Sequence, residues 1–267
     1  MAQTSRFGGL FWAVISVVVF VSVVRACLDE DTTPSALSDA DSEDSPAFYQ
    51  SEVEEGLGAA VAILVDTSAS MSEIAPGDTR PKYVVVRQAL SEMLKATDAF
   101  AKKRPDFPIK VTVFGFASSP WQVLPIQTFD SDTVLAAVQK LSSPGGGTAI
   151  GEALQAARGE LYRSGVFRKY ILVLTDGQNT VGTEPEPIAR TIYEKSQQSV
   201  PIYFVAFDTD PQLFGFLKDV GGDVLPANNA VELQSALKQI YEGKILAEAV
   251  DYGEGDKLSG AREKGTP

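Results

Sequence analysis

Short apolar runs, separated by segments with helical spacing, restrict the fold of this chain more than any other feature. The runs Ala59–Val65, Tyr170–Leu174 and Ile202–Phe207 are apolar throughout, and Ile109–Phe116 is expected to be a further strand. A strand that is apolar at every position is covered on both faces, which is typical of parallel sheets between two layers of helices. Because strands and helices alternate along the chain, the sequence predicts a doubly wound α/β domain with a mostly parallel sheet.

Helical patterns fill the intervals between these runs. A helix is expected to begin at Pro81, because proline is common in a first turn and apolar residues then recur at helical spacing as far as Leu94. The other expected elements are an edge strand at Trp121–Leu124, helices at 134–141, 150–161, 188–198, 213–217 and 231–249, and a short strand at Asp223–Leu225.

Changes in composition divide the chain into four segments, of which residues 58–250 are the expected α/β domain, a normal size for one such unit. Residues 27–57 hold ten acidic residues and no Lys or Arg, which favours a disordered, solvated tether. Residues 251–267 are polar and Gly-rich, and we expect a disordered tail. Residues 58–250 carry 21 acidic and 18 basic residues, so we expect no basic surface for nucleic acid.

Residues 1–26 have the composition of an export signal or an N-terminal membrane anchor. The apolar run from Leu10 to Val24 has 15 residues, the length of a signal-peptide core and short for a membrane span. The following "VRAC" resembles a bacterial lipobox, in which Cys27 would be lipidated, although Arg25 stands where a small or apolar residue is usual. Cleavage after Ala26 with a free thiol, or an uncleaved anchor, are the alternatives. All three predict a domain exported to the cell envelope, periplasmic or at the surface.

The amino-acid inventory excludes several classes of enzyme. The chain has no histidine and one cysteine, so a Ser-His-Asp triad, an HExxH zinc site and an internal disulfide are all impossible within it. Any chemistry must therefore use carboxylates, hydroxyls and the backbone.

Polar residues follow the expected strand ends, where ligands bind in open parallel sheets. Asp66, Ser68 and Ser70 in "DTSAS" follow the first strand, Thr148 lies in "GGGTAI", and Asp176 follows the strand that ends near Leu174. If the backbone of "DTSAS" stays extended, its three alternate side chains point the same way. These are oxygen ligands only, the set that Mg²⁺ and similar hard cations prefer.

These five residues carry a resemblance to the von Willebrand factor type A (vWA) family over about residues 58–249. The family's metal-ion-dependent adhesion site uses a DxSxS motif, a distant Thr and a distant Asp, and all five positions match in order. The resemblance implies Mg²⁺, Mn²⁺ or Ca²⁺ held directly by Ser68, Ser70 and Thr148, with Asp66 and Asp176 binding directly or through water. It also implies that a partner protein completes the coordination with Asp or Glu.

Plainer interpretations exist for the same residues. Ser70 and Glu73 fit a helix capping box, Thr148 could cap the helix beginning near Ala149, and Asp176–Gly177 is a common turn sequence. The glycines before Thr148 match neither nucleotide-binding motif, so no nucleotide is expected, and they more plausibly shape the backbone at Thr148.

The predicted function is a non-enzymatic, cation-dependent protein-binding module for adhesion or complex assembly, tethered to the envelope. A Mg²⁺-dependent phosphoryl hydrolase is the enzymatic alternative, but aspartyl-nucleophile phosphatases need an acid two positions after the nucleophile, where this chain has Ser68. Arg80 and Lys82 are the only basic residues near the motif loops, so transition-state charge has few stabilisers. A scaffold with a purely structural metal is the third possibility.

Overall fold

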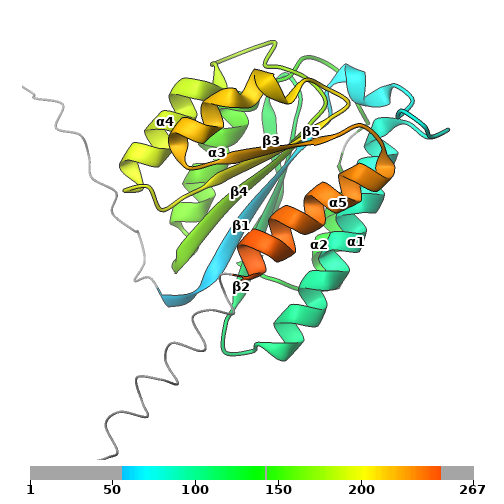
Figure 1. Cartoon of the computed structure of the whole chain (residues 1–267). Helices are drawn as coiled ribbons and strands as arrows, with labels where there is room; N and C mark the ends of the chain where they lie inside the picture. The colour runs from blue at the N-terminus through cyan, green and yellow to red at the C-terminus, as the bar shows by residue number, and fades with distance from the viewer. Residues whose placement is uncertain (1–55, 142, 248–267) are drawn as a thin grey trace, which may run out of the picture. The chain divides into compact units, whose positions relative to one another are not determined.

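The computed structural model describes residues 56–141 and 143–247, which form a three-layer α/β domain (Figure 1). The predicted export segment, Cys27, most of the predicted tether and the predicted tail lie outside the described residues. In the described part of the chain, no helix has both the length and the apolar character that crossing a membrane requires.

A six-stranded sheet in the order β3-β2-β1-β4-β5-β6 forms the middle layer, and every neighbouring pair is parallel except β2 and β3. The strands are β1 (Gly56–Asp66), β2 (Ile109–Phe116), β3 (Pro120–Thr128), β4 (Val166–Thr175), β5 (Ile202–Phe207) and β6 (Asp223–Ala227). The predicted fold class is therefore confirmed.

Helices cover both faces of this sheet (Figure 1). On one face lie α1 (Lys82–Lys103), α2 (Ser131–Gln139) and α5 (Ala230–Ile240), with the π-helical turn η3 (Tyr241–Leu246). On the other face lie α3 (Ile150–Tyr162), α4 (Pro185–Lys195) and the 3-10 segment η2 (Pro211–Val220).

Strand β1 shows why its sequence is apolar at every position. Val61, Ile63 and Val65 pack into the core under α1 and α5, while Ala62 and Leu64 pack into the core under α3. All five side chains are buried, so a polar residue in this part of the strand would lose solvation whichever way it pointed.

Several elements differ from the sequence expectation in length. Edge strand β3 is longer than Trp121–Leu124, because its pairing with β2 continues through a register shift to Thr128. The expected helix at 231–249 is α5 followed by η3, and its last residues lie outside the described ones. Helix α4 begins three residues before the expected Ile188, with Pro185 in its first turn.

Candidate metal centre

The two predicted carboxylates lie at the ends of neighbouring parallel strands. Asp66 is the last residue of β1, and Asp176 follows Thr175, the last residue of β4. The chain leaves β1 toward β2 on one side and later returns to β4 on the other, so the strand order reverses here (Figure 1). This reversal point is where doubly wound sheets bind ligands.

Asp66 is completely buried and is held by uncharged donors. Its Oδ2 accepts a hydrogen bond from Thr175 Oγ1 at 2.6 Å, and its Oδ1 accepts one from the Ser68 amide at 2.7 Å. Burial raises the pKa of Asp66 to about 6, although these hydrogen bonds lower it, and the nearby Asp176 carboxylate raises it further. A cation beside Asp66 would offset the free energy that burial of its charge costs.

The segment after Asp66 turns rather than continuing as a strand. The Ser68 amide bends back onto Asp66, and the short 3-10 helix η1 occupies Ala69–Ser72. The condition for alternation, an extended backbone throughout "DTSAS", is therefore met at Ser68 but not from Ala69 on. The turn still brings the hydroxyls together, since Ser68 Oγ and Ser70 Oγ are 3.1 Å apart.

Ser70 connects the first motif to the second carboxylate. Its hydroxyl donates to Asp176 Oδ1 at 2.8 Å, across 106 residues of sequence. Side chains that follow two different strands therefore form one continuous polar cluster.

The loop that carries Thr148 is joined to the "DTSAS" segment through the backbone. Gly145 N donates to Thr67 O at 2.8 Å, and Ala69 N donates to Gly146 O at 3.1 Å. Gly146 has a left-handed φ of 81°, and an added Cβ there would lie 2.6 Å from Ser118 Oγ, so a side chain at this position would be strained. The glycine-rich stretch thus shapes the loop, as the sequence suggested.

Thr148 is buried and does not cap the helix that follows it. The capping residue of α3 is Ala149, and the Ile150 amide at the start of α3 donates instead to Asn179 Oδ1 at 2.8 Å. The Thr148 amide donates to Thr180 Oγ1 at 2.8 Å. The loop after β4 therefore supports Thr148 from one side and leaves its hydroxyl out of the helix cap.

The capping-box interpretation of Ser70 and Glu73 is also wrong. The residue at the N-cap of η1 is Ser68, whose side chain makes no capping hydrogen bond. The Glu73 carboxylate binds Lys82 instead, with a distance of 3.1 Å between Oε2 and Nζ. Helix capping therefore accounts for none of the three hydroxyl groups in the predicted set.

Lys82 is the main residue that sequence reasoning underrated. Its Nζ lies 3.1 Å from Asp176 Oδ2 and 2.8 Å from Asp208 Oδ2, besides the contact with Glu73, and its side chain is only 4% exposed. Burial lowers the pKa of Lys82, but hydrogen bonds to Asp208, Asp176 and Glu73 outweigh it and raise the pKa above its usual value. Lys82 is therefore a permanent positive charge beside the predicted metal ligands.

The donor set is suited to a hard divalent cation. The predicted set consists of two carboxylates and three hydroxyls. Within residues 56–141 and 143–247, no cluster of three or more Asp, Glu, His or Cys side chains could hold a metal by itself. Any ion here would depend on hydroxyl and water oxygens as well as Asp66 and Asp176, which matches the preference of Mg²⁺ and Mn²⁺.

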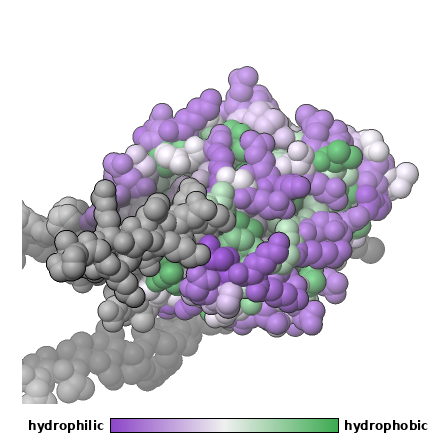
Figure 2. All heavy atoms as spheres, turned by 60° about the horizontal axis from the view of Figure 1, so that its bottom comes forward, coloured by the Kyte–Doolittle hydropathy of each residue, from purple (hydrophilic) through white to green (hydrophobic). Residues whose placement is uncertain are grey.

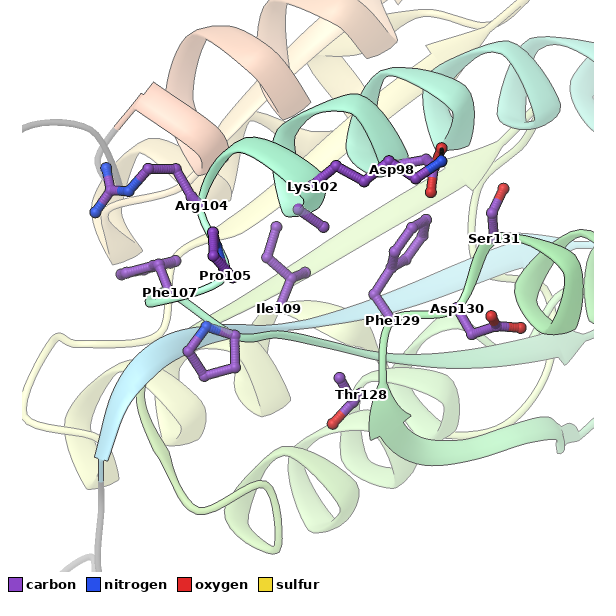
Figure 3. A pocket seen from close by; sticks show the side chains of 12 residues that line it. Asp98, Lys102, Arg104, Pro105, Phe107, Ile109, Thr128, Phe129, Asp130 and Ser131 are labelled. Atoms are coloured by element: carbon purple, nitrogen blue, oxygen red, sulfur yellow. Dashed lines mark hydrogen bonds and ion pairs between the residues drawn. The ribbon is translucent and has the colours of Figure 1, made fainter.

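A separate hollow lies at the opposite end of the sheet, near the start of β2. It has a volume of about 320 Å³, and Ile109 and Phe129 lie in it between α1 and the strands (Figure 3). The charged groups around it are paired with neighbours, such as Lys102 with Asp98 at 2.6 Å. Figure 2 shows the domain with this end turned forward, where hydrophilic side chains predominate and apolar ones are scattered.

The sheet order defines a doubly wound α/β domain, and an oxygen-rich cluster lies at the point where the strand order reverses. Residues 60–242 match the sequence model of the von Willebrand factor type A domain, and the chain belongs to this family. A comparison with curated proteins gives no significant match.

Solved structures share this fold at low sequence identity. The PilB minor pilin from Streptococcus sanguinis is 17% identical, with a TM-score of 0.57, and 72% of this chain covers 62% of the pilin chain. BatB from Bacteroides thetaiotaomicron is 21% identical, with a TM-score of 0.55 and coverage of 73% and 100%. Proximal thread matrix protein 1 from the mussel byssus, solved with a zinc-occupied MIDAS motif, is 21% identical, with a TM-score of 0.54 and coverage of 70% and 46%. This chain thus spans about three fifths of the pilin's length.

Proposed function

We propose that this protein is a divalent-cation-dependent protein-binding module, with Asp66, Ser68, Ser70, Thr148 and Asp176 as the residues that hold the ion. The observation that carries the proposal is the environment of Asp66. This carboxylate is completely buried, yet no Lys or Arg in the described part of the chain forms an ion pair with it. Buried carboxylates are normally paired or metal-bound, so Asp66 calls for a cation.

The bound ion would supply a Lewis-acidic position that accepts an external carboxylate. The proposed ligand set holds two carboxylates, Asp66 and Asp176, and each of them already accepts protein hydrogen bonds. The ion is therefore not fully neutralised by the protein and can accept a further carboxylate. Acidic side chains of a protein partner are the natural ligand for the remaining position, as the membership in the vWA family also suggests.

Apolar side chains at the same end of the domain support a protein as the partner. Ile74, Val181 and Leu213 are 57%, 37% and 43% exposed, and they lie in the segments that follow β1, β4 and β5. An acid-binding ion with exposed apolar groups around that edge suits a protein surface better than a small anion.

The phosphoryl-hydrolase alternative gains no support from the site geometry. Ser68, at the position of the required second acid, donates its amide to Asp66 and lies beside Ser70. Lys82 is enclosed by three carboxylates, and Arg80 is paired with Asp78. Both basic residues near the motif loops are therefore engaged by protein acids rather than aimed at a transferring phosphoryl group.

We further propose that the domain works at the cell envelope, adhering to or assembling other proteins there. The sequence of residues 1–57 supports this, with an export or anchor segment, a lipidation candidate at Cys27 and an acidic tether. The attachment can be tested by labelling the lipid-modified protein in cells and measuring how much of it is released. The measurement is made for the natural chain and for Cys27→Ser, and the two are compared.

The direct test of the metal site is thermal unfolding of the full chain with and without excess Mg²⁺ or Mn²⁺. An ion at about a hundred times its dissociation constant adds about 2.7 kcal/mol, which is a shift of several degrees for a domain of this size. We expect this shift in the natural chain and its loss in Asp66→Asn, which keeps the side-chain shape. An equal shift in both proteins would refute the proposed ligand set.

A further inference from the structure

The cluster around Lys82 joins the segments that follow β1, β4 and β5 through one ammonium group. Lys82 is the first residue of α1, Glu73 follows η1, Asp176 follows β4, and Asp208 follows β5. The three carboxylate oxygens lie 2.8 to 3.1 Å from Lys82 Nζ. Such a contact set is built into the fold, because each acid comes from a different segment.

Asp208 is positioned for this contact by an unusual backbone conformation. Its φ is 55°, in the left-handed region that residues other than glycine seldom adopt. Its amide donates to Ala227 O at 2.8 Å, which anchors it against the end of β6. Backbone strain of this kind is held only where the surroundings fix it, and here it aims a carboxylate at Lys82.

The two oxygens of Asp176 are held by different donors. Oδ1 accepts from the Ser70 hydroxyl, whereas Oδ2 contacts the Lys82 ammonium at 3.1 Å, and the Asp176 side chain is 0% exposed at this contact. The Lys82 ammonium is thus a fixed positive charge that is separated from the predicted ion by the Asp176 carboxylate.

The Lys82 ammonium changes the net charge of the site. Asp66 and Asp176 carry two negative charges and Lys82 one positive charge, so the buried groups sum to −1 and a divalent ion brings the sum to +1. Glu73 and Asp208 also carry negative charge, but their side chains are 67% and 37% exposed, so water screens their effect at the site. A partner carboxylate would then neutralise the site.

We propose that Lys82 is a specificity-determining residue, which weakens the hold of the protein's own carboxylates on the ion and thereby directs the ion toward an external carboxylate. This inference rests on the proposed function and deepens it, since it assigns ligand preference to a residue outside the ligand set. The inference predicts two opposite effects of Lys82, because its positive charge weakens metal binding and strengthens anion binding.

The test measures both affinities in one series of full-length proteins. Mn²⁺ binding is followed by the loss of the free-ion electron paramagnetic resonance signal, and acetate binding to the Mn²⁺-loaded protein by water-proton relaxation. In Lys82→Met we expect Mn²⁺ affinity to rise about tenfold and acetate affinity to fall about tenfold, since one unit charge near the ion is removed. Lys95→Met, at an exposed position of α1 paired with Glu92, is the matched control and should change neither.

Asp208→Asn is a second variant for the case in which Lys82→Met does not fold. Asn tolerates the left-handed backbone, and the change removes one screening charge from Lys82. Both effects should then reverse sign, with Mn²⁺ binding about threefold weaker and acetate binding about threefold tighter.

A purely structural Lys82 gives a different pattern. If it only held Asp176 in place, both variants would bind Mn²⁺ more weakly and acetate no better, and the inference would be overturned. Unchanged affinities in both variants would also overturn it. Failure of the natural chain to bind Mn²⁺ at all would instead refute the proposed function, so the two failures are distinguishable.

Discussion

The two ends of the sheet treat charged side chains differently. Near the start of β2, Lys102 pairs with Asp98 while 75% of the lysine side chain remains exposed. At the carboxyl ends of β1 and β4, Lys82 is almost fully buried among three carboxylates, and the buried Asp66 has only uncharged donors. Lys102 and Asp98 are a one-to-one pair in contact with solvent. The buried side chains of Asp66, Asp176 and Lys82 at the other end carry unequal numbers of negative and positive charges. That inequality is the reason for proposing an ion at the second end.

The largest expected effect that sharpens this comparison is on stability. Lys82→Met should lower the free energy of unfolding of the metal-free protein by about 3 kcal/mol, because it leaves the buried Asp176 without its counter-charge. Lys102→Met, at the other end, should change it by less than about 0.5 kcal/mol. Urea unfolding measures both, and equal losses would show that the two ends do not differ.

The next effect concerns pH and Asp66. The pKa of this carboxyl is raised from 3.8 to about 6 in the folded protein, so folding favours the protonated form. The raised pKa stabilises the folded protein fully below pH 3.8, and this stabilisation is lost as pH rises through about 6. The free energy of unfolding then falls by about 3 kcal/mol. Urea unfolding of the metal-free natural chain and of Asp66→Asn, from about pH 4 to 7, measures this loss. We expect the difference in the free energy of unfolding between the two proteins to change with pH by the amount of the loss. Parallel stability curves for the two proteins would contradict it.

Divalent ions should reverse that pH dependence. Because a proton and a cation compete for Asp66, Mg²⁺ affinity should rise by about tenfold per pH unit below about pH 6 and level off above it. Isothermal titration calorimetry between pH 5 and 8 checks this. A flat profile would mean that Asp66 is not among the groups that bind the ion.

A smaller loss of stability than that for Lys82→Met is expected from removing a helix cap at the opposite end. Asp130 caps α2 by accepting a hydrogen bond from the Thr133 amide at 2.9 Å, so Asp130→Ala should cost about 1 kcal/mol. Mg²⁺ should raise the melting temperature of this variant as much as that of the natural chain. A reduced Mg²⁺ shift would show that the two ends are energetically coupled.

The sequence predicted the sheet, and it placed Asp66 and Asp176 at neighbouring strand ends, for a clear reason. Apolar strands and strand-end polar residues are local patterns, and parallel topology then brings Asp66 and Asp176 together. The 3-10 helix that begins at Ala69 was not predicted, because strand propensity carries no information about side-chain contacts such as the one from the Ser68 amide to Asp66. Thr175, directly before Asp176, is also visible in the sequence as a polar residue after an apolar run, but its hydrogen bond to Asp66 is not.

Lys82 was harder to assign from the sequence. A lysine after a proline at a helix start is ordinarily solvated, and nothing local indicates that Asp176 and Asp208, 94 and 126 residues further on, enclose it. Only the packing of α1 against the strand ends shows this. Long-range pairing of charges is the part of the site that composition and spacing do not contain.

The burial of Lys82 also determines how the site responds to ionic strength. Dissolved salt screens exposed pairs such as Lys102 with Asp98, since mobile ions approach them closely. An ammonium group on a side chain that is 4% exposed is reached far less by such ions. When salinity rises, the domain would thus keep the internal charge of Lys82 while its surface pairs weaken.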